Sequence, residues 1–162
     1  SAIQIGFGAK KAQNTNKAEK GIAKKANTEV VPRYVREIRV AKDYAAEVGS
    51  VLKADMFAAG DAVAVTGTMI GKGFQGAIKR HGFTLGPQSH GSKNNRITGT
   101  QGAMDRGGRI PTGQKKPGHM GLDQVTIRGL KIIEVLTDKN VVLISGAIPG
   151  PKNGLVVVEA TA

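Results

Sequence analysis

The chain has 162 residues, enough for one domain with an extension, and it is 40% hydrophobic but only 4% aromatic. Its 24 Lys and Arg against 12 Asp and Glu give a net charge of +12, which favours a polyanionic partner such as nucleic acid. The absence of cysteine excludes disulfides and thiolate metal sites, and the absence of an apolar run of about 18 residues argues against a membrane-spanning helix.

The first part of the chain alternates between predicted strands and basic, polar sequence. Alternating apolar and polar residues predict strands over Ala2–Phe7 and Tyr34–Val40, and a third strand is predicted over Ala62–Gly67. Between the first two, Lys10–Lys25 is rich in Lys and Ala but has no wide apolar face, which predicts a loop and a short exposed helix. The pattern over Val51–Phe57 fits a helix or a strand equally well.

The last part of the chain carries the strongest strand pattern. Strands are predicted over Val125–Leu136, with a bulge or corner at Gly129, and over Val141–Ser145 and Leu155–Glu159. The turn residues Thr137–Asn140 join the first two of these strands into a hairpin. About six short strands separated by turns predict a mainly β fold, either a small antiparallel β-barrel or a twisted sheet.

Residues 71–121 interrupt this β pattern and hold most of the charge. They contain nine Lys and Arg against one acid, Asp105, and 13 of the 23 glycines. No helical or strand period runs through them, and a segment this poor in apolar residues cannot offset its ordering entropy by burial. We therefore predict a body formed by residues 1–70 and 122–162, and a glycine-rich basic extension over 71–121 that a polyanion orders.

The Lys, Arg and His side chains of this extension are the candidate nucleic-acid contacts. Because so few aromatic residues accompany them, structured RNA recognised through its shape and backbone fits better than a single strand stacked on aromatic rings. The predicted RNA-binding residues are Lys72, Lys79, Arg80, His81, His90, Lys93, Arg96, Arg106, Arg109, Lys115, Lys116 and His119.

Patterns that would indicate an enzyme are weak. The loop Gly71–Gly76 matches G-x-G-x-x-G, but an apolar helix, an acid about 20 residues later and a terminal Gly-Lys-Ser/Thr are all missing. The three histidines stand in glycine-rich polar sequence without nearby carboxylates, so no metal or other cofactor is predicted, and no nucleophile–base arrangement is visible. A nucleotide-binding enzyme that uses the Gly71–Gly76 loop, and a free RNA chaperone or regulator, stay open as alternatives.

Five motifs give the chain a family resemblance. They are GKGFQGAIKRHGF (71–83), SHGS (89–92), KKPGHMG (115–121), VTIRGLKII (125–133) and SGAIPGPKNGLV (145–156). In order and spacing they resemble the large-subunit ribosomal protein L-three family, in its bacterial or organellar form, and the resemblance covers essentially the whole chain.

The resemblance implies a non-enzymatic, structural protein of the large ribosomal subunit. A small translation-type β-barrel would bind large-subunit rRNA, support subunit assembly and contact neighbouring ribosomal proteins. The ribosome would be that of the bacterial cytoplasm or of a plastid or mitochondrial matrix. The extension would reach toward the peptidyl-transferase centre, with its tip within 98–109, at Thr98, Gly102, Ala103, Met104, Asp105 and Arg106.

Two departures from the family pattern matter. Family members usually carry a few dozen more N-terminal residues, so either a separate polypeptide supplies the first barrel strands or the barrel keeps an open edge; of the two, we expect a separate strand beside Ala2–Phe7. A glutamine that can be methylated in many bacterial members is not found at Ala103–Asp105, so that modification is not transferred. Asp105 is instead expected to pair with Arg106 or Arg109.

Overall fold

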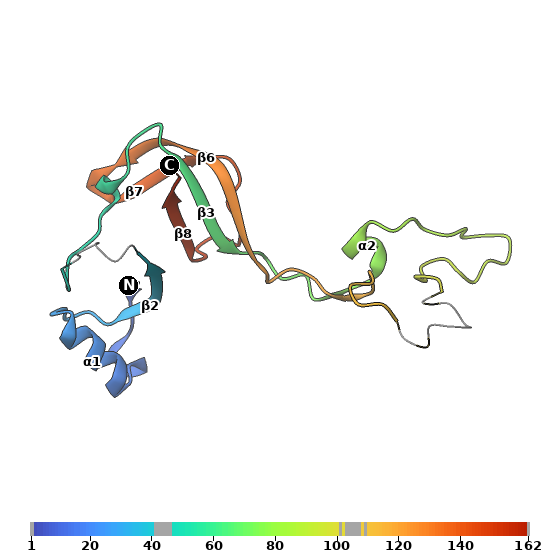
Figure 1. The fold of residues 1–162 in the computed structure, drawn as a ribbon, viewed down its shortest axis with the longest axis horizontal. Helices are drawn as coiled ribbons and strands as arrows, with labels where there is room; N and C mark the ends of the chain where they lie inside the picture. Colours follow the sequence, from blue (N-terminus) through green and yellow to red (C-terminus); the bar gives the residue numbers. More distant parts are fainter. Residues whose placement is uncertain (1, 41–46, 101, 103–107, 109, 162) are drawn as a thin grey trace. The chain divides into compact units, whose positions relative to one another are not determined.

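In the computed structural model the protein is mainly β, with antiparallel sheets and few helices. The structure describes residues 2–40, 47–100, 102, 108 and 110–161. These residues form two compact units, one over Ser1–Lys53 and the other over Ala54–Ala162 (Figure 1). The described strands form one four-stranded and two two-stranded sheets and do not close into a barrel, so the barrel stays a prediction.

The first unit is a two-stranded ribbon with a helix in its connection. Strand β1 (Ala2–Ala9) pairs antiparallel with β2 (Pro32–Arg39), from Ala2 opposite Arg39 to Ala9 opposite Pro32. The connection holds a 3₁₀ turn, η1 (Ala12–Asn14), and the helix α1 (Lys17–Lys25). The predictions of a strand, a loop with a short exposed helix, and a second strand are therefore confirmed.

The second unit is organised around an antiparallel sheet in the order β7-β6-β3-β8, here called the sheet. The predicted third strand and the three predicted C-terminal strands are all present, within a residue or two of their expected bounds. The strands are β3 (Ala62–Thr68), β6 (Gln124–Leu136), β7 (Val141–Ser145) and β8 (Val156–Ala160), and the 3₁₀ turns are η2 (Ala54–Met56) and η3 (Thr137–Lys139). The ambiguous segment 51–57 is thus neither a strand nor an α-helix.

The core of the sheet is small and aliphatic. Val63 and Val65 alternate along β3 and are fully buried, and Ile132 of β6 is 2% exposed beside them. Partly buried side chains pack around these three: Phe57, Leu130, Val135, Val142, Ile144, Val156 and Val158. The alternating valines of β3 therefore mark the face that carries this cluster, and Ala64 between them is buried as well, on the opposite face of the strand.

A bulge lies where the sequence predicted one. Val63 pairs with Leu130 and Val65 with Ile127, so β6 holds one more residue than β3 in this interval. Gly129 stands in the interval with a φ of +76°, in the left-handed region that favours glycine. The bulge at Gly129 is confirmed.

Residues 71–121 are called the arm from here on, and the part of the arm that the structure describes contains three short elements. Strand β4 (Phe74–Gln75) pairs with β5 (Gly118–His119), and the helix α2 (Ala77–His81) follows β4. Periodicity does not predict α2, because five residues are too few to show a helical period.

Candidate nucleic-acid interface

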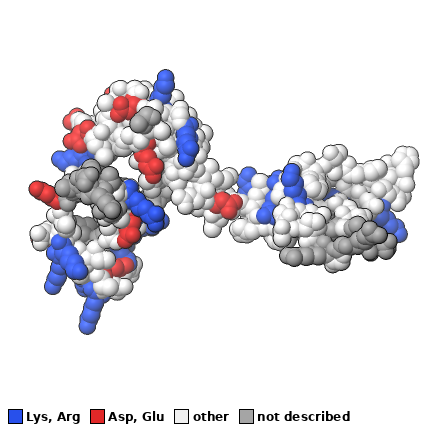
Figure 2. Space-filling model, in the orientation of Figure 1, with Lys and Arg blue, Asp and Glu red and all other residues white. Residues whose placement is uncertain are grey.

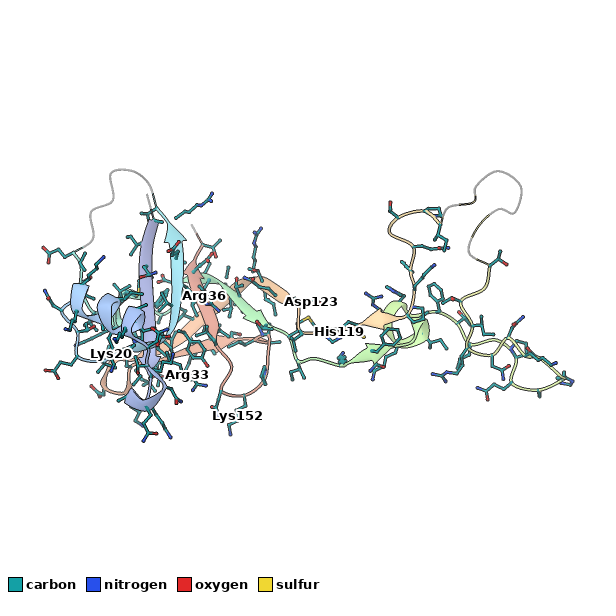
Figure 3. The ribbon with its side chains drawn as sticks, turned by 90° about the horizontal axis from the view of Figure 1, so that it is seen from below. Lys20, Arg33, Arg36, His119, Asp123 and Lys152 are labelled. Atoms are coloured by element: carbon teal, nitrogen blue, oxygen red, sulfur yellow. The ribbon has the colours of Figure 1, made fainter. Side chains whose placement is uncertain are left out.

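The two ends of the arm are hydrogen-bonded to each other beyond the sheet. Met69 donates its N–H to the Asp123 carbonyl (2.9 Å), Lys72 to the Met120 carbonyl (2.9 Å), and Met120 to the Gly73 carbonyl (3.0 Å). We call these two paired stretches, 69–75 and 118–123, the neck. Figures 1 and 3 show them side by side, continuing from β3 and β6. The neck fixes where the arm begins and ends.

Gly121 lets the two stretches of the neck approach closely. A Cβ atom at this position would collide with the Ile70 carbonyl oxygen and would lie 3.0 Å from the Gly71 Cα. Its φ of +77° is in the left-handed region as well. Both requirements are met by glycine alone among the ordinary residues, which gives one glycine of the basic segment a definite structural role.

Helix α2 is fastened to the returning stretch of the arm through one carbonyl oxygen. Arg80 Nη1 donates to the Lys116 carbonyl (2.8 Å), and His81 Nε2 lies 3.1 Å from the same oxygen. Because a carbonyl can only accept, His81 Nε2 must carry a hydrogen in this arrangement. The Arg80 guanidinium also lies against Gly118, where a Cβ would stand 2.5 Å from Nη1. Two of the predicted RNA contacts therefore also hold the arm together.

The described cations of the arm lie mostly on its surface. Six are exposed and have no carboxylate partner among the residues that the structure describes: Lys72, Lys79, Arg80, Lys93, Arg96 and Lys115. Lys116 is half-buried. In the face shown by Figure 2, the described residues of the arm beyond the neck show Lys and Arg but no Asp or Glu, whereas both signs are mixed among the other described residues.

The three histidines do not form a group. His81 ends α2, His90 stands in a turn with a φ of +57°, and His119 pairs with Phe74 in the β4–β5 ladder. Within the described part of the chain, no cluster of three His, Asp or Glu residues could hold a metal ion. Each histidine is thus placed separately along the arm.

The glycine-rich loop Gly71–Gly76 is part of the neck rather than a phosphate cradle. The Lys72 N–H and the Gly73 carbonyl are both bonded to Met120, and the Gln75 side chain donates to the Lys72 carbonyl. The helix that follows has only five residues. A phosphate loop instead keeps its backbone N–H groups free at the start of a longer helix.

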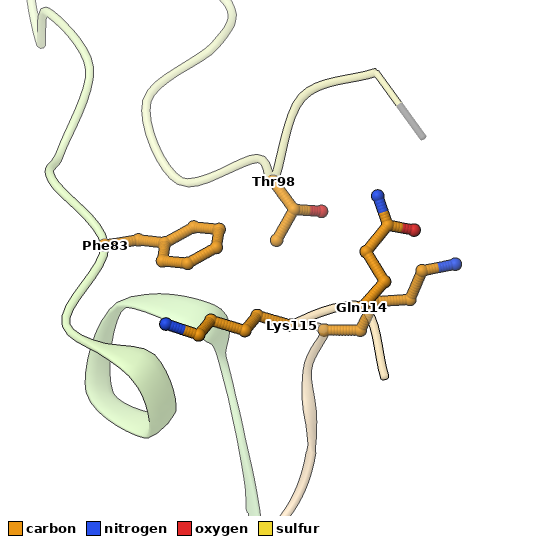
Figure 4. Close-up of a pocket in the computed structure, with 5 residues that line it drawn as sticks. Phe83, Thr98, Gln114 and Lys115 are labelled. Atoms are coloured by element: carbon orange, nitrogen blue, oxygen red, sulfur yellow. The ribbon is translucent and has the colours of Figure 1, made fainter. Parts of the chain in front are cut away.

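A cavity of about 180 Å³ in the arm brings together three residues that were predicted from the sequence and two that were not. It is lined by Phe83, Thr98, Gln114, Lys115 and Lys116 (Figure 4). The two lysines were predicted as RNA contacts and Thr98 as part of the tip, but Phe83 and Gln114 were not singled out. The sequence offered one feature that could have drawn attention to Phe83: it is one of only two phenylalanines in the arm.

One lysine of the first unit, Lys10, is neutralised within the fold, whereas Lys11, Lys17, Lys20, Lys24 and Lys25 are exposed as the arm's cations are. Lys10 Nζ forms a salt bridge with Glu19 Oε1 (2.6 Å), and Glu19 completes a capping box with Asn16 at the start of α1. The hydrogen bond from Lys10, followed by that from the Asn16 N–H, holds the pKa of the Glu19 carboxyl below its usual value. Here a cation is neutralised within the fold, which is not seen for the exposed cations of the arm.

Most of the predicted tip lies outside the described residues. That applies to Ala103, Met104, Asp105, Arg106 and Arg109, so the expected pairing of Asp105 stays a prediction. Gly102 is described and exposed. None of the described helices is long and apolar enough to cross a membrane.

Comparison with known proteins gives consistent matches. The family model described as Ribosomal protein L3 matches residues 15–140. The large ribosomal subunit protein uL3 of Oceanobacillus iheyensis is 53% identical over 155 residues, which cover 96% of this chain and 73% of that protein. The proteins of the same name from Brevibacillus brevis and Pelotomaculum thermopropionicum are 53% and 46% identical, and cover 98% and 100% of this chain and 75% and 76% of their own length.

Proposed function

Because this chain belongs to the ribosomal protein L3 family, we infer that it is a structural constituent of the large ribosomal subunit. Binding to rRNA is consistent with the family. Membership of this family implies rRNA and other ribosomal proteins as partners. The observation that supports this function most directly is the arm, whose six exposed cations have no carboxylate partner among the described residues. Such cations attract phosphates, since no carboxylate in the described part of the fold neutralises them.

We propose that the arm is the main rRNA-binding element. The neck holds its ends in a fixed position, while the arm buries little apolar surface of its own. An RNA scaffold would supply the missing contacts, so the arm is expected to gain order on binding. The predicted residues Lys72, Lys79 and Arg80 stand on or beside the neck and α2, where they would contact RNA phosphates from a rigid support.

A salt titration of rRNA binding tests this proposal. The logarithm of the association constant should fall linearly with the logarithm of salt concentration, with a slope of roughly 0.7–0.9 per phosphate contacted. A variant with Lys72, Lys79, Lys93 and Lys115 all changed to Gln should bind more weakly and with a shallower slope. An affinity for large-subunit rRNA that does not depend on salt would overturn the proposal.

Experiments can distinguish the two alternative functions from a ribosomal one. A free RNA chaperone would sediment in the light fractions of a cell extract, whereas a ribosomal protein would stay with large subunits in high salt. A nucleotide-binding enzyme would show saturable binding of NAD or ATP in equilibrium dialysis, lost in Gly73→Val. The use of the Gly71–Gly76 backbone in the neck disfavours the enzyme. We propose that the chain performs no catalysis of its own.

The remaining family expectations are also proposals. We propose that the sheet forms part of a small β-barrel over residues 1–70 and 122–162, and that the tip of the arm reaches toward the peptidyl-transferase centre and supports assembly. The relatives compared above are bacterial, which favours a bacterial ribosome over one in a plastid or mitochondrion.

A strand from another polypeptide is proposed to pair beside Ala2–Phe7. A two-stranded ribbon such as β1–β2 is marginally stable by itself, and its outer edges offer backbone groups for pairing. A cooperative thermal transition of the first unit in the isolated chain would count against this partner.

A further inference from the structure

The cavity in the arm forms where three stretches far apart in sequence meet (Figure 4). Phe83 comes from the stretch after α2, Thr98 from the middle of the arm, and Gln114 and Lys115 from the stretch before β5. In Figure 4 the Phe83 ring and the Thr98 side chain point toward each other across the cavity, with Gln114 and Lys115 on its other side. The cavity is therefore a product of the folded arm.

Hydrogen bonds hold the walls of this cavity in place. Arg80 and His81 both contact the Lys116 carbonyl, at 2.8 Å and 3.1 Å, which fixes the stretch before β5 against α2. Gly86 donates its N–H to the Asn95 carbonyl (3.0 Å), which draws the middle of the arm toward the stretch that carries Phe83. Each wall is thus tied to another by at least one contact.

The lining offers four kinds of interaction in a small space. The half-buried Phe83 ring presents an apolar face, and the His81 ring lies 6.2 Å from it, centroid to centroid. The Gln114 amide and the Thr98 hydroxyl can each donate and accept hydrogen bonds, and Lys115 brings an exposed ammonium group. Together these groups suit a ligand that is planar, polar at its edge and attached to an anion.

Size and charge narrow the choice of ligand. A volume of about 180 Å³ is below the roughly 300–1,000 Å³ of sites that enclose a small molecule, so a dinucleotide cofactor would not fit inside. No carboxylate is among the described residues that line the cavity, so these residues do not offer the carboxylate ligands that hard cations prefer. A single nucleobase, with its ribose and phosphate outside beside Lys115, meets both conditions.

We propose that this cavity receives one unpaired nucleobase of the bound rRNA. The base stacks on Phe83, Gln114 and Thr98 hydrogen-bond its edge, and Lys115 contacts its phosphate. The proposal rests on the proposed function, because rRNA supplies the base. The hydrogen bonds to the base edge would depend on which base is bound. The other Lys and Arg side chains of the arm would contact only the RNA backbone.

Chemical probing of the rRNA complex of the full chain tests the proposal. Base reactivity is measured with dimethyl sulfate and a carbodiimide for the wild type, for Phe83→Leu and for Gln114→Ala. The matched controls are Phe74→Leu and Gln88→Ala, since Phe74 is 75% exposed and Gln88 is exposed, and neither lines the cavity. One nucleotide should be protected in the wild type and both controls, and reactive in both cavity variants.

The affinity of the same complexes provides a second readout. Loss of base stacking should weaken rRNA binding by Phe83→Leu between about fivefold and 150-fold, with an unchanged salt slope because no phosphate contact is lost. Normal binding with no difference in base reactivity between Phe83→Leu and Phe74→Leu would overturn the cavity proposal and leave the proposed function intact.

Equilibrium dialysis with AMP, CMP, GMP and UMP separates rRNA from free nucleotides as the source of the base. Saturable binding of one of them that is lost in Phe83→Leu, in a chain that does not bind rRNA, would overturn both proposals and make the cavity a site for a free nucleotide. A chain that binds neither rRNA nor a nucleotide would also overturn both.

Discussion

The sheet buries Val63, Val65 and Ile132 in a continuous apolar cluster, whereas the described residues of the arm include only two buried ones, Ala77 and Gly121. The sheet can therefore draw its stability from removing apolar surface from water. The arm is held by backbone bonds across the neck, which contribute only about 1 kcal/mol each, and by the contacts of Arg80 and His81 to the Lys116 carbonyl. We therefore expect the sheet to fold by itself and the arm, as proposed above, to need bound rRNA for its order.

The charges follow the same division. Residues 122–162 carry four bases and four acids, while residues 71–121 carry nine bases and one acid. A balanced surface suits a part that folds in water, and an unbalanced one suits a part that enters a polyanion.

The largest effect is expected in the core of the sheet. Ile132→Ala should lower the free energy of unfolding of the second unit by about 2–5 kcal/mol, because it opens a cavity beside Val63 and Val65. The neighbouring Ile133 is 63% exposed, so Ile133→Ala should cost less than about 1 kcal/mol. Urea denaturation followed by circular dichroism measures both. Equal losses would show that the sheet does not depend on the cluster.

A smaller, local effect is expected in the neck. Gly121→Ala forces a side chain into the left-handed region, at about 1–2 kcal/mol, and also against the Ile70 carbonyl. In the rRNA complex, hydrogen exchange at the Lys72 and Met120 amides should accelerate at least about tenfold.

The control for the neck is Gly113→Ala. Gly113 has a φ of +80° but open space around its Cβ position, so the same backbone cost arises without a collision. Exchange at the Lys72 and Met120 amides should stay as in the wild type. Faster exchange in both variants would mean that the neck is not held by close packing at Gly121.

The strands and the cavity show what a sequence can reveal. Strands β3 and β6 can be predicted because the alternation of apolar and other residues is visible among neighbours in the sequence. The bulge in β6 can be predicted because Gly129 itself stands at it. Helix α2 and the cavity depend on Arg80 and His81 contacting a carbonyl 36 and 35 residues away. No local pattern encodes that pairing, so Phe83 and Gln114 could not be recognised as neighbours.

A change in salt dependence is expected when single charges are removed from the arm. Lys79→Gln should make the slope of rRNA binding shallower by roughly 0.7–0.9, since Lys79 is exposed on α2 and has no carboxylate partner among the described residues. Lys139→Gln removes the same charge beside Asp138, at the turn of the β6–β7 hairpin, and should leave the slope unchanged. Equal changes in slope would show that the arm is not the preferred RNA contact.

The smallest effect concerns a cation that the fold does neutralise, Lys10. Its hydrogen bond, with that of the Asn16 N–H, lowers the pKa of Glu19, so this carboxyl stabilises α1 above pH 4.5 and loses that effect as the pH falls through its lowered pKa. Carbon-detected NMR titration should therefore place the Glu19 pKa below 4.5 in the wild type and higher in Lys10→Gln. Glu19→Gln should remove this part of the acid-induced loss of helix. A Glu19 pKa that is the same in the wild type and in Lys10→Gln would show that the ion pair is not formed in solution, and that Lys10 carries its charge as the exposed cations of the arm do.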